Sequence, residues 1–175
     1  MGNTPIADQI HTPLICLLEE LAGVLRSLSD EQYTHRFGEV FDSSIGGHVR
    51  HVLDHVAAWL DATADGELNY DRRQRGTDVE THRQIAVDHC EQLIDRLNQS
   101  PADGERTLTL HVLLSADAPP ITTTTTVARE AAFVVGHTVH HNAIISVMAR
   151  MRGGQLPAKF GYAPSTLAFL RTRGR

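Results

Sequence analysis

Long stretches of this sequence repeat apolar residues at intervals of three and four, which constrains its fold more than any other feature. This spacing places the apolar side chains along one stripe of an α-helix, and such a stripe has to be buried against other helices. The pattern predicts four long helices, at residues 5–28, 45–63, 77–97 and 127–152. Four helices of this length favour a bundle around a shared core.

Two kinds of local signal complete the predicted fold. Ser29 with Gln32, and Thr77 with Glu80, have the spacing of capping boxes that begin a helix. The segments 107–114 and 121–127 are rich in β-forming residues around a turn containing two prolines, which predicts a hairpin. We therefore expect an all-α four-helix bundle with a small β-hairpin between helices 3 and 4. We expect one domain over residues 1–175, with its core at about 5–153 and a loop and short helix at 154–175.

Charge and hydropathy restrict the partners. The formal net charge of −5 argues against nucleic acid, since binding to phosphates requires a positive surface. No apolar run reaches the ~18 residues needed to span a bilayer, and the N-terminal residues lack the pattern of a signal peptide. These features predict a cytoplasmic protein that acts on a small molecule, without nucleic acid or membrane. Helix faces of such a bundle could also support a homodimer.

Histidine is the unusual residue of this chain, with 11 copies, of which six lie in two short stretches. His137 and His141 are four residues apart, so they project from one helix face and can bind one ion together. Apolar residues share that side, which indicates that the pair faces the interior. The other four members are His140 on its flank and, at spacings of three and four on helix 2, His48, His51 and His55.

Six imidazoles on inward faces indicate a metal site. A buried imidazole needs partners for both ring nitrogens, and neutral imidazole is a preferred metal ligand. The sequence contains no HExxH motif, no zinc-finger cysteine pairs and no Glu-x-x-His. A mononuclear site with three histidines remains, with open positions for water or substrate. Two alternatives stay open: a non-catalytic module in which His48 or His55 is a permanent fourth ligand, and a metal-free bundle of paired histidines.

The stretches SIGGHVRHVLDH and REAAFVVGHTVHHNAI resemble the two signature segments of the DinB/YfiT-like superfamily, over nearly the whole chain. The resemblance implies a metal-binding four-helix bundle in which His51, His137 and His141 are the ligands. His48, His55 and His140 would be additional or second-layer residues. Members of this superfamily include thiol transferases that use low-molecular-weight thiols, a thiol-dependent isomerase and putative hydrolases.

The resemblance therefore implies an enzyme in which one divalent transition metal activates a thiol or water for transfer to a small electrophile. Zinc is the metal we put first, with nickel or iron as alternatives, and a low-molecular-weight thiol is the expected cosubstrate. A thiol transferase is preferred to a metal-dependent hydrolase only because of the resemblance. The third hypothesis is a non-catalytic metal-binding or sensing module.

Other polar and aromatic residues are candidates for roles around the site. Glu130 lies two helical turns before His137, and Asp54 follows His51 by three residues, so either could be a base or could orient a ligand. Tyr70, Arg72, Arg73 and Arg75 could hold an anionic cosubstrate. The mouth of the site could be closed by a group in the C-terminal segment: Phe160, Tyr162 and Ser165.

Overall fold

The computed structural model describes residues 6–38, 42–72, 74–101 and 103–174. Four of its helices are long, and they match the four predicted segments to within a few residues at most ends. The elements in chain order are α1 (Ile6–Ser27), α2 (Asp30–Thr34), α3 (Ile45–Asp65), β1 (Glu67–Leu68), a 3-10 turn (Asp78–Glu80), α4 (Arg83–Gln99), β2 (Thr107–Val112), β3 (Ile121–Thr126), α5 (Val127–Met151) and α6 (Pro164–Arg173). The predicted start of the first helix at residue 5 lies outside the described residues.

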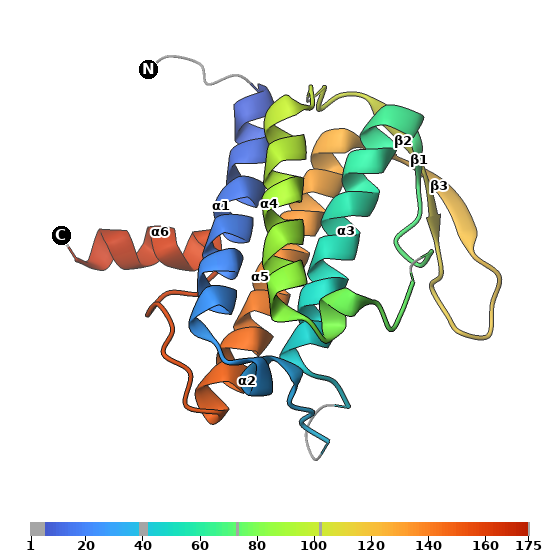
Figure 1. Cartoon of the computed structure of the whole chain (residues 1–175). Coiled ribbons are helices and arrows are strands. Elements are labelled where there is room, and N and C mark those ends of the chain that lie inside the picture. The colour runs from blue at the N-terminus through green and yellow to red at the C-terminus, as the bar shows by residue number, and fades with distance from the viewer. Residues whose placement is uncertain (1–5, 39–41, 73, 102, 175) are drawn as a thin grey trace.

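The four long helices pack side by side in a closed ring (Figure 1). Helix α1 contacts α4 and α5, and α3 also contacts α4 and α5. The apolar stripe of each helix therefore faces the same central space, as the periodicity predicted. This arrangement brings α3 and α5, the two histidine-bearing helices, into direct contact.

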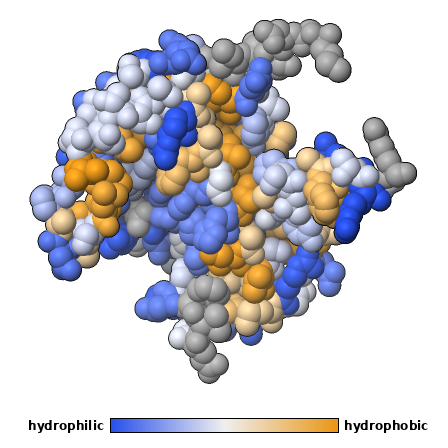
Figure 2. All heavy atoms as spheres, turned by 180° about the vertical axis from the view of Figure 1, so that it is seen from behind, coloured by the Kyte–Doolittle hydropathy of each residue, from blue (hydrophilic) through white to orange (hydrophobic). Residues whose placement is uncertain are grey.

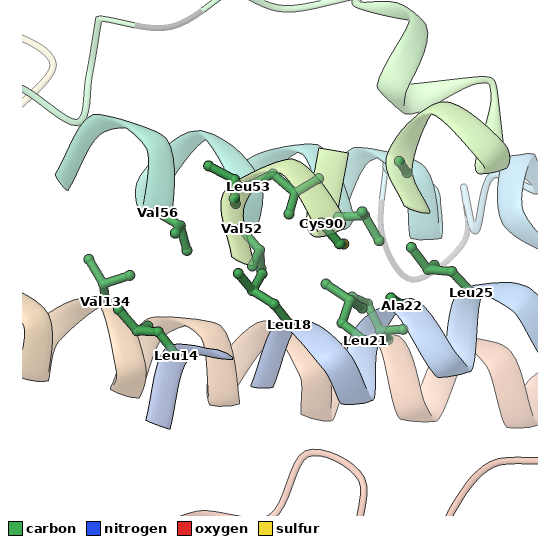
Figure 3. Close-up of a cluster of buried hydrophobic side chains, with 14 of the residues drawn as sticks. Leu14, Leu18, Leu21, Ala22, Leu25, Val52, Leu53, Val56, Cys90 and Val134 are labelled. Carbon is green, nitrogen blue, oxygen red and sulfur yellow. The ribbon is translucent and has the colours of Figure 1, made fainter. Parts of the chain in front are cut away.

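Buried aliphatic side chains fill the space between the helices (Figure 3). From α1, Leu14, Leu18 and Leu21 meet Val52 of α3 and Val134 of α5, and none of these side chains is exposed. Burying one such side chain contributes roughly 1.5–3 kcal/mol. The core therefore fixes the separation and rotation of α3 and α5 on which any site between them depends.

The sheet differs from the predicted hairpin by one strand. Strands β2 and β3 form the expected antiparallel hairpin, with Thr107 opposite Thr126 and Val112 opposite Ile121. The short strand β1 adds to β2 in parallel, with Leu68 opposite Leu110. A two-residue strand is too short to give a period in the sequence, so the prediction missed it. The hairpin leads directly into α5, since Thr126 ends β3 and Val127 begins the helix. The Thr126 side chain caps α5 by accepting a hydrogen bond from Arg129 N.

The two predicted capping boxes have different outcomes. The box at Ser29 and Gln32 is confirmed, with both reciprocal hydrogen bonds present. The box at Thr77 and Glu80 is wrong, since residues 78–80 form a 3-10 turn without a side-chain cap and α4 begins at Arg83. The Glu80 carboxylate is engaged elsewhere, because it lies 2.6 Å from Nε of the buried Arg50 and accepts from Gly76 N.

Helix α6 projects away from the ring of helices and buries none of its side chains (Figure 1). The view from behind shows hydrophobic and hydrophilic surface together on this projecting part (Figure 2). Phe169 and Leu170 account for exposed apolar surface there. Across the described part of the chain, each helix is either too short or too polar to cross a membrane.

Candidate metal centre

The contact between α3 and α5 brings together imidazoles that the sequence separates by 86 residues. His51 of α3 faces His137 of α5, with 3.0 Å between their Nε2 atoms. His55, one turn after His51, stacks on the His137 ring with 4.2 Å between centroids. His51, His55 and His137 each offer a nitrogen within 4.8 Å of the other two. Three imidazole nitrogens this close can reach one transition-metal ion at about 2.0–2.1 Å.

His141, the third ligand expected from the resemblance, lies beside this group. Its ring centroid is 4.7 Å from that of His51 and 4.6 Å from that of His137. Its Nδ1 atom is 3.0 Å from Nδ1 of His48. Because His48 meets His141 while His51 meets His137, the two helices run in opposite directions here. The geometry thus places His141 next to the group and His55 within it.

His140 has a different environment from the other five histidines. Its side chain is exposed, although its ring centroid lies 5.2 Å from that of His141. The spacing along α5 had predicted a flank position for this residue. Since water reaches it freely, His140 borders the site from the solvent side.

A main-chain contact fixes the tautomer of His55. The Nδ1 atom of His55 lies 2.8 Å from the carbonyl oxygen of His51. A carbonyl oxygen can only accept a hydrogen bond, so Nδ1 of His55 carries the proton and Nε2 keeps a lone pair. Such a contact orients a metal-binding imidazole and selects the nitrogen that faces the ion.

The pKa of His141 favours its neutral form. Burial, together with the neighbouring imidazoles of His137 and His48, lowers this pKa from its ordinary value of 6.5 to about 3. Burial also lowers the pKa of His48. Neutral imidazoles are the form that binds metals, so both residues are in the competent protonation state near neutral pH.

Glu130 supports the site through Tyr70. Its fully buried carboxylate accepts from the Tyr70 hydroxyl at 3.1 Å, from Thr125 at 2.8 Å and from Arg129 at 2.7 Å. The Tyr70 ring is nearly parallel to the His55 ring, with 4.9 Å between centroids. Burial, followed by the negative charge of Glu130, raises the pKa of Tyr70, so the hydroxyl stays a donor. In the described structure Glu130 thus reaches the imidazoles through Tyr70.

Phe133 forms the exposed wall of the site, and sequence reasoning missed it. Its ring stacks against His137 with 5.5 Å between centroids and lies 5.2 Å from the Tyr70 ring. The Arg129 guanidinium lies over the Phe133 ring, 5.7 Å from its centroid. The available signal was its place four residues before His137, which puts both side chains on one helix face. Phe133 is 38% exposed, so it shields the group from one side without closing it.

The remaining predicted residues are not part of the three-histidine group or lie outside the described chain. Asp54 pairs with Arg50 at 2.7 Å and lines a groove of about 340 Å³, which Tyr70 and His89 also line. Arg72 is exposed at the same groove, and Arg73 is outside the described residues. In the C-terminal segment, Phe160 is buried against the body while Tyr162 and Ser165 are exposed.

These features define a class: a mostly helical protein with a histidine group that could hold a metal ion between two helices. The chain belongs to the DinB superfamily, whose family model matches residues 17–145. That range includes all six clustered histidines. Among solved structures, the fold is similar to a DinB-like protein, YjoA of Bacillus subtilis, with a TM-score of 0.63 and 18% identity over 87% of this chain and 98% of that chain. No curated protein matches the chain.

Proposed function

We propose that this protein is a metal-dependent enzyme that activates a small thiol for attack on a small electrophilic substrate, with water as the alternative nucleophile. The proposal is carried by the nitrogens of His51, His55 and His137, which lie within 4.8 Å of one another. Imidazole ligands suit zinc, nickel and iron, and we put zinc first. Bound there, such an ion would lower the pKa of a thiol or of water enough to form the nucleophile near neutral pH.

The chain's own residues have two tasks in this proposal. Tyr70, held by the buried Glu130, keeps the His55 ring in place by stacking on it. Phe133 and Arg129 form the exposed wall, where the aromatic ring offers apolar contact and the guanidinium offers a positive charge. A substrate would therefore approach along Phe133 toward His137. We prefer the thiol to water because of the resemblance to thiol transferases in the DinB/YfiT-like superfamily.

A second candidate is a metal-binding or sensing module without turnover. One specific observation favours it: His141 adjoins both His51 and His137, so the contact offers more imidazoles than an open three-ligand site requires. If four imidazoles bind the ion, no position is left in a tetrahedral sphere for a thiol or water. The two candidates therefore differ in whether an exchangeable ligand completes the coordination.

The test uses the full chain purified without a histidine tag and loaded with zinc, nickel or iron(II). Metal content is measured by mass spectrometry, and thiol consumption is followed with glutathione or cysteine and a panel of alkyl halides and epoxides. Hydrolysis of p-nitrophenyl acetate tests the water branch. We expect about one bound ion for each chain and metal-dependent consumption of thiol, both lost in His137→Ala. Stable binding without thiol consumption or ester hydrolysis would contradict the enzyme and support the module.

A further inference from the structure

A second pair of imidazoles crosses the α3–α5 contact beside the three-histidine group. Nδ1 of His48 lies 3.0 Å from Nδ1 of His141, and the ring centroids are 5.2 Å apart. His141 in turn packs against His51 and His137. His141 therefore connects His48 to the two imidazoles whose Nε2 atoms face each other.

The distance between the two Nδ1 atoms limits where one proton can be. Nitrogen atoms 3.0 Å apart are at hydrogen-bond distance, so one Nδ1 donates and the other accepts. If His48 donates, the proton of the neutral His141 ring is on Nε2, and that nitrogen cannot bind a metal. If His141 donates, its Nε2 has a lone pair. Only the second arrangement makes His141 a metal ligand through Nε2.

A second metal ion bound between His48 and His141 is the competing explanation for the short distance between their Nδ1 atoms. It would lie about one helical turn, ~5 Å, from an ion in the three-histidine group. Two divalent cations at that separation repel strongly unless negatively charged ligands lie between them. The rings that pack on His141 in the described structure are imidazoles, which supply no negative charge. A hydrogen bond therefore explains the pair better than a second ion.

We propose that His48 is a positioning residue whose Nδ1 accepts the Nδ1 proton of His141 and so keeps Nε2 of His141 available to the metal. The proposal rests on the metal-binding part of the proposed function and takes His141 as a ligand, whether or not the site turns over a substrate. His55 offers a parallel, because its Nδ1 donates to the His51 carbonyl and its Nε2 therefore carries the lone pair that a metal needs. In this arrangement His55 and His141, which both pack on the His51–His137 pair, each carry the proton on Nδ1 and the lone pair on Nε2.

The experiment compares zinc affinity, measured by competition with a chelator, in the wild type and three variants. His48→Asn can still accept from Nδ1 of His141, whereas His48→Leu cannot. His140→Asn is the matched control, because it removes a neighbouring but exposed imidazole. We expect His48→Leu to weaken zinc binding roughly 10- to 100-fold, as the loss of an orienting partner does. We expect His48→Asn to retain most of the affinity and His140→Asn to match the wild type.

A second measurement reads the tautomer directly. Long-range ¹H–¹⁵N spectra of the zinc-loaded wild type should show His141 protonated at Nδ1, which a merely structural role of His48 would not require. Protonation at Nε2, or unchanged zinc affinity in His48→Leu, overturns the proposal while the proposed metal site stands. An equal loss in His140→Asn also overturns it. A wild type that binds no zinc overturns both. If His48→Leu does not fold, the wild-type tautomer decides.

Discussion

At the residue scale, the imidazoles of the α3–α5 contact differ in how they lie relative to the point between the Nε2 atoms of His51 and His137. Nε2 of His51 and Nε2 of His137 face each other at 3.0 Å, so both belong to any ligand set centred there. We therefore expect His51→Ala and His137→Ala to abolish high-affinity zinc binding. His55→Ala and His141→Ala should each weaken it by at least about tenfold, or about 1.4 kcal/mol.

The control for these variants is His82→Ala, which removes an exposed imidazole that precedes α4. Zinc titration by calorimetry measures these five variants and the wild type in one series. If His137→Ala bound zinc as tightly as His82→Ala, the candidate site would be misplaced. If His55→Ala alone were unchanged, the ligand set implied by the family resemblance would be the better description.

Tyr70 allows its two contacts to be tested separately. Its hydroxyl donates to the buried Glu130, while its ring stacks on His55. Tyr70→Phe removes only the hydrogen bond, so we expect the free energy of unfolding to fall by about 1–3 kcal/mol with little change in zinc affinity. Tyr70→Leu removes both contacts and should also weaken zinc binding. Urea unfolding and zinc titration check the pair, and a large affinity loss in Tyr70→Phe would contradict this separation.

The lowered pKa of His141 predicts how stability depends on pH in the metal-free protein. The unfolded chain gains a proton at this residue as the pH falls below about 6.5, whereas the folded chain stays neutral until about pH 3. The unfolded state thus binds more protons in this window, so the free energy of unfolding decreases as the pH falls. The contribution is at most about 1.4 kcal/mol per pH unit.

Urea unfolding between about pH 7 and pH 4 measures this slope. Replacing His141 with Gln removes the titrating group while keeping a polar side chain. We expect the variant to lose less stability over this range than the wild type does. Parallel pH profiles for the two proteins would show that His141 titrates normally in the folded state.

Sequence reasoning at this scale identified the histidines and named Glu130 and Tyr70 as candidates near them, but not the contacts by which they support His55. Spacing on two helices was sufficient to predict that imidazoles converge, because helix geometry fixes which residues share a face. The partners come from outside those repeats: Tyr70 lies in the segment after β1, and Thr125 lies in β3. A helical period carries no information about which loop or strand packs on which side chain.

At the element scale, the glycines at the start of α3 show why propensity alone misjudges this helix. Glycine has low helix propensity, so by propensity alone Gly46 weakens the helix. The structure gives its reason: a Cβ at Gly46 would lie 2.1 Å from the Glu80 carbonyl oxygen and 2.9 Å from the Tyr33 ring. The absence of a side chain at Gly46, in the first turn of α3, therefore lets the 78–80 turn approach the backbone of the helix.

Two glycine-to-alanine variants test this explanation. Gly46→Ala should lower the free energy of unfolding by roughly 1–3 kcal/mol, because the new methyl group collides with backbone. Gly136→Ala, within α5, meets nothing within 4 Å and should raise it by about 0.5–1 kcal/mol through helix propensity. Thermal unfolding followed by circular dichroism compares them. Stabilisation by both substitutions would mean that the approach of residue 80 is not tight.

The lengths of the long helices were predictable because each carries an apolar stripe of many turns. The start of α4 was not predictable, because the Thr77–Glu80 pattern does not cap a helix in this structure. Glu80 lies 2.6 Å from Arg50, a buried cation that needs a carboxylate partner. A tertiary ion pair thus overrode a local capping signal, and no feature of residues 77–80 alone indicates it.

At the scale of the whole molecule, metal binding should stabilise the fold, because the ligands come from helices that are far apart in the sequence. An ion that binds only the folded state, present at 100 times its Kd, adds about 2.7 kcal/mol to the free energy of unfolding. For a chain of this length, that gain corresponds to a rise in Tm of roughly 5–11 °C. A metal bound to this group would thus join α3 to α5 in addition to the shared core.

Differential scanning calorimetry with and without zinc measures this shift, and a chelator should reverse it. His137→Ala removes one of the two imidazoles that face each other across the contact, so its Tm should not respond to zinc. His82→Ala leaves the contact intact and should shift as the wild type does. An equal shift in His137→Ala would mean that zinc binds elsewhere on the folded chain, because a ligand stabilises a protein only through the site that it occupies.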